Sequence, residues 1–179
     1  MLQITVPARE LWDEASERFI RLKETTLKLE HSLISISKWE SKWCKPYFET
    51  EDKTDEEIRD YIKCMTLNTN VDDLVYQCLT YQNISDINNY VMAPMTASTV
   101  KTLDEAKAHN NEFITSELIY YWMIAYNIPV EFEKWHINRL IMLIRICSEK
   151  NKPPKKMTTR EALQHQRALK AARRAKRRK

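Results

Sequence analysis

Glycine is absent from the entire chain of 179 residues, although average usage would supply roughly a dozen. Glycine is the residue that adopts positive φ angles freely and lets a backbone approach a phosphate group closely. A Walker A loop, a dinucleotide-binding fingerprint and a kinase glycine loop all require it. The sequence therefore excludes these three kinds of nucleotide site.

The length predicts one compact domain with an appendage, because domains average roughly 150 residues. Apolar residues make up 43% of the chain and charged residues 30%, which is close to ordinary globular usage. Most of the chain can therefore bury a core.

The formal charge of +4 hides two oppositely charged regions. Residues 151–179 hold twelve Lys or Arg and one acid, a charge of +11, whereas residues 1–150 hold 17 basic and 24 acidic residues, a charge of −7. The tail is expected to attract polyanions. It can serve as a solvated tail, dock on its own acidic body, or bind nucleic acid or an acidic protein. Its densest basic residues are Arg173, Arg174, Lys176, Arg177, Arg178 and Lys179.

The sequence indicates a cytoplasmic protein. Residues 1–7 lack the basic start and apolar run of a secretory signal. The most apolar stretch, residues 114–130, contains Glu117 and Asn127 and is too short to span a membrane. The four cysteines are scattered singly, which favours reduced thiols.

Apolar periodicity predicts a mainly helical α+β fold. Period-2 alternation at residues 4–6, 19–22 and 25–29 predicts a small antiparallel sheet within residues 1–31, packed on the body. A compact helical body is expected at 32–150, followed by a helical or disordered basic tail at 151–179.

The first two helices carry clear start signals. Ser32 is placed to cap a helix with an apolar face through Leu33, Ile36, Trp39 and Trp43. Thr54 begins a capping box, followed by a predicted buried stripe at Ile58, Tyr61, Ile62 and Met65. Shorter helices are predicted at 71–79 and 85–92, with residues 80–83 as a connection. A helical hairpin is predicted at 112–126 and 131–149, the second arm being the central core helix.

No pattern points to catalysis, a cofactor, a metal or a small-molecule substrate. The four histidines and four cysteines never fall in CxxC or HxxxH spacing. The acidic clusters at residues 55–57 and 72–73 stand where helix first turns favour negative charge. We therefore expect a protein that is not an enzyme.

Five tryptophans are expected to anchor the core, because they recur at helical spacing beside Leu and Ile. The alternative is that aromatic side chains form a surface for a protein partner. The candidate partner-binding residues are Trp39, Trp43, Tyr47, Phe48, Tyr121, Trp122 and Trp135.

Several blocks resemble a family of proteins from the structural-gene region of long-tailed bacteriophages and prophages. They are residues 29–33 (LEHSL), 35–43 (SISKWESKW), 61–66 (YIKCMT), 93–97 (APMTA), 114–129 (ITSELIYYWMIAYNIP), 134–140 (KWHINRL) and 153–157 (PPKKM). The resemblance implies a tail assembly chaperone in the host cell cytoplasm that binds the tape measure protein, the tail tube protein or both. It implies no catalytic residues.

Two other functions remain open. The basic tail makes the chain a candidate nucleic-acid-binding phage protein, and a minor head–tail connector of the virion is the other alternative. Self-association is compatible with each of them.

Overall fold

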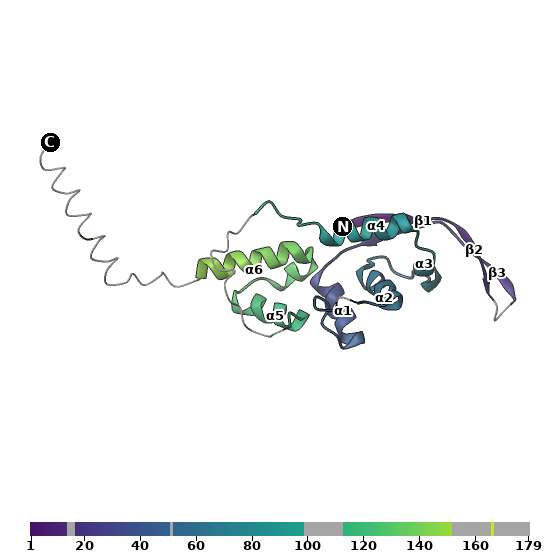
Figure 1. Cartoon of the computed structure of the whole chain (residues 1–179). Helices are drawn as coiled ribbons and strands as arrows, with labels where there is room; N and C mark the ends of the chain where they lie inside the picture. The colour runs from purple at the N-terminus through teal and green to yellow at the C-terminus, as the bar shows by residue number, and fades with distance from the viewer. Residues whose placement is uncertain (14–16, 51, 99–112, 152–165, 167–179) are drawn as a thin grey trace, which may run out of the picture. The chain divides into compact units, whose positions relative to one another are not determined.

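The computed structural model describes residues 1–13, 17–50, 52–98, 113–151 and 166. The chain divides into two units, Met1–Ser148 and Glu149–Lys179. As predicted, it is mainly helical with a small antiparallel sheet at the N-terminus (Figure 1). Apart from residues 151 and 166, the predicted basic tail lies outside the described residues.

The N-terminal sheet is a long antiparallel ribbon made of two consecutive ladders. β1 (Leu2–Val6) pairs with β4 (Thr25–Leu29), and β2 (Arg9–Asp13) pairs with β3 (Arg18–Leu22). Pro7 separates β1 from β2 and lacks the N–H group needed to continue the ladder. The predicted alternation is present, with Ile4, Val6, Leu27 and Leu29 buried. β2 was not predicted, because its sequence RELWD lacks that alternation.

α1 (Leu33–Trp43) and α2 (Asp55–Met65) pack against each other through their predicted faces. Ser32 and Thr54 are the N-caps, and the Thr54 capping box is complete. The predicted stripe of α2 was wrong at one position. Ile58 is 39% exposed, whereas the carboxylate of Glu57 is buried in its place.

α3 (Asp73–Gln77) is shorter than predicted, and α4 (Tyr81–Met92) begins earlier. The connection predicted at residues 80–83 is wrong, because Thr80 caps α4 and forms a capping box with Asn83. The Asn83 amide also donates to the carbonyl oxygen of Thr5 at 3.2 Å, which attaches α4 to β1. In Figure 1, α4 lies along β1.

The last helices depart most from the prediction. α5 (Ser116–Ala125) is capped by Thr115. The single helix predicted at 131–149 is wrong: a 3-10 turn, η1 (Val130–Lys134), is followed by extended backbone at Trp135, and α6 (Ile137–Asn151) begins afterwards. The break arises because the backbone after η1 pairs with a distant segment. The Ile137 N–H donates to the carbonyl oxygen of His31 at 2.8 Å.

Because the chain has no glycine, other residue types adopt the positive φ angles that its turns require. The described residues with positive φ are Glu17, Cys44, Asn70, Met95 and Asn127. Asparagine tolerates this conformation, but other side chains pay about 1 kcal/mol or more for it. At the C-cap of α1, Cys44 adopts φ 53° while its N–H donates to the carbonyl oxygen of Glu40. This helix end stores strain that a glycine would relieve.

Candidate functional site

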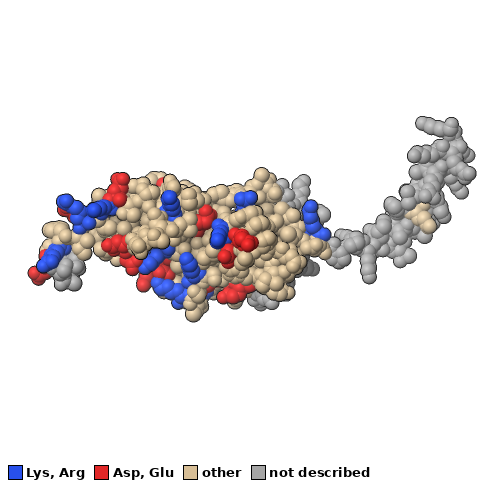
Figure 2. Space-filling view, turned by 180° about the vertical axis from the view of Figure 1, so that it is seen from behind, with Lys and Arg blue, Asp and Glu red and all other residues tan. Residues whose placement is uncertain are grey.

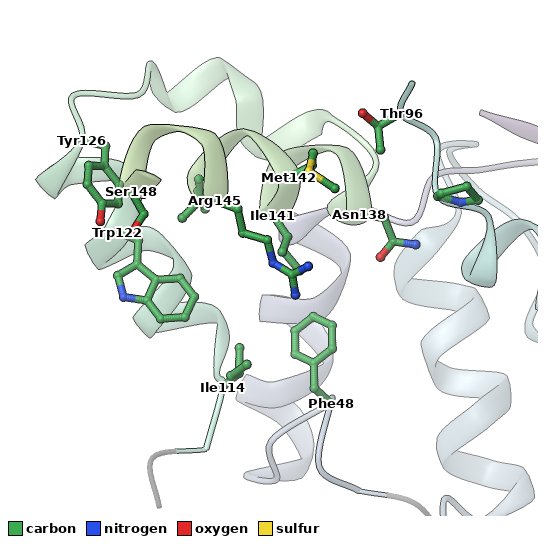
Figure 3. A pocket seen from close by; sticks show the side chains of 12 residues that line it. Phe48, Thr96, Ile114, Trp122, Tyr126, Asn138, Ile141, Met142, Arg145 and Ser148 are labelled. Carbon is green, nitrogen blue, oxygen red and sulfur yellow. The ribbon is translucent and has the colours of Figure 1, made fainter. Parts of the chain in front are cut away.

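An open groove of about 670 Å³ runs beside α6, within the first unit of the chain. Twelve residues line it, and most of them are apolar or aromatic (Figure 3). α6 supplies one wall, and α5, the loop that carries Phe48 and the segment after α4 supply the rest. A groove of this size and character is suited to an apolar ligand or an apolar segment of a partner.

The α6 wall follows directly from helical geometry. Asn138, Ile141, Met142 and Arg145 stand at positions i, i+3, i+4 and i+7, so they share one face, and Ser148 continues it. A neighbouring face of the same helix is buried through Ile137 and Leu140. α6 therefore packs into the core on one side and lines the groove on another.

Aromatic side chains supply the opposite wall. Trp122 and Tyr126 come from the last turns of α5 and its C-cap, and Phe48 comes from the loop after α1. Figure 3 shows the rings of Trp122 and Phe48 and the guanidinium group of Arg145 directed into the same space. The groove therefore combines a broad apolar surface with one cation.

A buried carboxylate holds two of these walls in place. Glu40 lies in α1 and is 7% exposed. Its Oε1 accepts from the Tyr47 N–H at 2.8 Å, and its Oε2 accepts from the Ser116 N–H at 2.7 Å. The first bond fixes the loop that carries Phe48, and the second places negative charge at the N-terminus of α5, where the helix dipole favours it.

A pair of buried histidines holds the start of α6 against the start of α1. The rings of His31 and His136 are 5.1 Å apart. His31 Nδ1 lies 2.5 Å from the Tyr61 hydroxyl. His136 Nε2 donates to the Tyr90 carbonyl at 3.1 Å, while its Nδ1 accepts from the Asn138 N–H. Both histidines therefore have structural hydrogen bonds.

Burial keeps these imidazoles uncharged. It lowers the pKa of His31 to about 3, with a further contribution from the neighbouring His136. Burial also lowers the pKa of His136, partly opposed by its bond to the Tyr90 backbone. Both imidazole rings of the pair are therefore neutral at neutral pH.

On α2, the Lys45 ammonium and the Thr54 N–H lower the pKa of the buried Glu57 carboxyl group.

Four of the proposed partner-binding residues lie close together in the sequence, and the patch that they were expected to form is not an exposed surface. They are Trp39, Trp43, Tyr47 and Phe48. Trp39 is fully buried, and its indole N–H donates to the Glu57 carbonyl oxygen at 3.0 Å. Trp43 is half-buried and donates to Asp60, and Tyr47 packs on Tyr61 with ring centroids 4.2 Å apart. Proposing Trp39 as a partner-binding residue was wrong, because the α1–α2 interface covers it. From this patch, only Phe48 lines the groove.

The three other proposed partner-binding residues, Tyr121, Trp122 and Trp135, do not form one surface, because only Trp122 lines the groove. Trp122 lines the groove, whereas Tyr121, one position along α5, is 63% exposed and is not part of the lining. Trp135 is half-buried, stacks on Phe132 at 4.1 Å and lies under the Arg139 guanidinium. The expectation that every tryptophan is a core anchor was also wrong, because Trp12 is largely exposed on β2. It pairs there with Phe19.

Sequence reasoning missed several residues of the site: Glu40, Tyr126, Ile141, Met142 and Arg145. The i, i+3, i+4 spacing of Asn138, Ile141 and Met142 was a usable signal, but the helix predicted at 131–149 was interpreted only as the central core helix. Glu40 gave no signal, because its two partners lie far along the chain.

Other kinds of site find little support in the part of the chain that the structure describes. No group of three or more His, Cys, Asp or Glu side chains there could hold a metal ion. None of the helices described is both long and apolar enough to cross a membrane. On the face seen in Figure 2, acidic and basic side chains of the body are interspersed. The basic residues Arg173, Arg174, Lys176, Arg177, Arg178 and Lys179 lie outside the described residues.

Comparison of this chain with protein-family models, with curated proteins and with solved structures found no match.

Proposed function

We propose that this chain is a non-enzymatic assembly factor that binds bacteriophage tail proteins, the tape measure or tail tube protein, in the host cell cytoplasm. The groove beside α6 carries the proposal. Its apolar and aromatic lining fits a partner segment that must be shielded from water until it is assembled.

An apolar helix is the occupant that best suits this groove. Helix-in-groove recognition uses residues at i, i+3, i+4 and i+7 of the bound helix against a wall of apolar and aromatic side chains. Ile141, Met142 and Trp122 provide such a wall. The likeness of the sequence blocks to phage tail-region proteins supports the identity of the partner.

The proposal is tested by pull-down from phage-producing cells with tagged full-length protein after nuclease treatment, with mass spectrometry of the bound proteins. Met142→Glu places a charge in the groove, and Ile124→Glu is the matched control, because Ile124 is 76% exposed on α5 and outside the lining. We expect tape measure or tail tube protein on the wild type and on Ile124→Glu, and a loss of at least fivefold on Met142→Glu. Equal capture by both variants, or no tail protein on the wild type, would contradict the proposal.

The connector alternative is separated by a second measurement. A chaperone leaves the assembled tail, so the chain should be absent from purified particles, whereas a connector would be present at fixed copy number. Detection of the chain in purified particles by mass spectrometry would favour the connector.

Nucleic-acid binding through the tail is the second candidate function, favoured by the +11 charge of residues 151–179. Replacing Arg173, Arg174, Lys176, Arg177, Arg178 and Lys179 with Gln should then weaken binding to a DNA duplex. It should also flatten the steep salt dependence that phosphate contacts produce. Binding of tail protein in the groove should not respond to the same substitutions.

A further inference from the structure

We propose that the groove selects an acidic amphipathic helix, in which a carboxylate beside the apolar stripe pairs with Arg145. This inference rests on the proposed function, because it specifies the kind of tail-protein segment that the groove accepts. It depends on charge, whereas the proposed function depends on apolar contact, so the two can fail separately.

Arg145 is the one charged side chain among the described residues that line the groove. It lies one turn beyond Ile141 and Met142 on the same face of α6, and Figure 3 shows its guanidinium group above the ring of Phe48. Among the described residues, no carboxylate forms an ion pair with it. The cation therefore lines a largely apolar groove and has no ion-pair partner among the described residues.

The guanidinium group of Arg145 also lacks a hydrogen-bond acceptor among the described residues. No side chain or backbone carbonyl there accepts a hydrogen bond from it. The amide N–H groups of its neighbour Asn138 donate to the carbonyl oxygens of Val91 and Ala93. In a complex, we expect the bound partner or water to supply the acceptor.

A helix lying in the groove would cover Arg145, and this makes the charge of the helix decisive. Covering an unpaired cation with apolar groups costs free energy, whereas a carboxylate offers two oxygens to the planar fork of N–H donors. A lysine at the same place would add like-charge repulsion. The groove thus favours Glu or Asp beside the stripe and disfavours Lys.

The same charge argues against other occupants. The chain's own tail at residues 151–179, with a charge of +11, would be repelled by Arg145. Nucleic acid requires several cations along a phosphate backbone, and the groove offers one among its described lining residues.

Two synthetic 18-residue peptides test the selectivity. Both carry Leu or Met at i, i+3, i+4 and i+7, and they differ only in Glu or Lys at the positions flanking the stripe. Binding to the full-length protein is measured by fluorescence anisotropy of the labelled peptides. Because the basic tail attracts any acidic peptide, each variant is judged against a charge-matched control, Arg59→Glu. Arg59 is exposed on α2, away from the groove.

We expect wild type and Arg59→Glu to bind the Glu peptide at least about fivefold more tightly than the Lys peptide, and Arg145→Glu to reverse or abolish that preference. Arg145→Gln should give an intermediate ratio. It also serves as a second variant if charge reversal disturbs the fold, which a thermal unfolding curve reports.

Three outcomes would overturn the inference. If Arg145→Glu keeps the wild-type ratio while Met142→Glu loses both peptides, the charge selectivity fails and the groove remains a binding site. If Met142→Glu binds both peptides like the wild type, the groove is not the site, and the proposed function loses its support as well. If oleate displaces the Glu peptide and binds with higher affinity, the carboxylate partner is a fatty acid rather than a helix.

Discussion

The α1–α2 pair and α5 are both apolar helical regions, but they use their apolar side chains differently. In the first pair, Trp39, Ile62 and Met65 are almost completely buried in the hydrophobic core. In α5, the buried positions are Ser116, Ile119 and Met123, and neighbouring apolar residues remain accessible. Ile124 is exposed, and Trp122 lies in the groove.

The difference shows that the apolar content of a helix does not tell how much of it is core. A helix that packs through one stripe retains other faces, and apolar residues on those faces favour a partner surface. Substitutions in the buried α1–α2 interface, the closed side, should therefore lower the stability of the fold. Substitutions of the residues that line the groove, the groove side, should instead weaken partner binding.

The largest contrast is expected between two tryptophans. Trp39→Ala should lower the free energy of unfolding by about 3–5 kcal/mol, because it leaves a cavity and removes the hydrogen bond from the indole N–H to the Glu57 carbonyl oxygen. Trp122→Ala should lower it by no more than about 1 kcal/mol and instead weaken peptide binding in the groove. Urea unfolding and anisotropy measure the two effects. Equal losses of stability would erase the distinction between the two sides.

The next largest loss of stability is expected at Glu40, which links α1 to the loop that carries Phe48 and to the start of α5. Glu40→Ala leaves the N–H groups of Tyr47 and Ser116 without their acceptor, which should cost about 2–4 kcal/mol of unfolding free energy. Glu40→Gln retains one acceptor oxygen and should cost less. Glu56→Ala, at an exposed position on α2, is the control. If the urea midpoint of Glu40→Ala matches that of Glu56→Ala, the carboxylate does not hold the walls together.

The histidine pair, which joins α1 to α6, predicts a loss of stability in mild acid. The pKa of His31 is lowered from 6.5 to about 3 in the folded state. Its stabilising contribution is therefore complete above pH 6.5 and is lost as the pH falls towards 3. Between pH 6.5 and 5 the loss should be about 2 kcal/mol from His31 alone. Urea unfolding at these pH values measures it.

His31→Gln provides the control for this pH effect, because glutamine does not titrate. In that variant the unfolding free energy should change less between pH 6.5 and 5 than in the wild type. A wild-type denaturation midpoint that is constant over this interval would refute a buried neutral His31.

The smallest effect is expected at the end of α1. Cys44→Gly should raise the free energy of unfolding by about 0.5 kcal/mol, because glycine adopts the positive φ of this C-cap without strain. The same substitution inside α2, Cys64→Gly, should lower it by about 1 kcal/mol. Differential scanning calorimetry can compare them. A lower melting temperature for Cys44→Gly would show that the C-cap is not strained.

Much of the fold was predictable where its causes are local. The strand alternation in β1 and β4, the Ser32 cap and the Thr54 capping box depend on neighbours within a few residues, and the structure confirms them. Less of the candidate site was predictable. Phe48 and Trp122, which were proposed as partner-binding residues, line the groove in the structure. Trp39 was proposed for the same role, but the tertiary structure buries it.

The sequence by itself determined the helix caps, the strand periodicity and the charge difference between body and tail, because each follows from residue types at short spacing. Only the tertiary structure decided where the helix predicted at 131–149 breaks, because the Ile137 N–H bonds to the distant His31 carbonyl. It also decided the role of Glu40, whose partner Ser116 lies 76 residues away. Contacts of that range depend on how whole elements pack, and the groove forms only where α5, α6 and the loop that carries Phe48 come together.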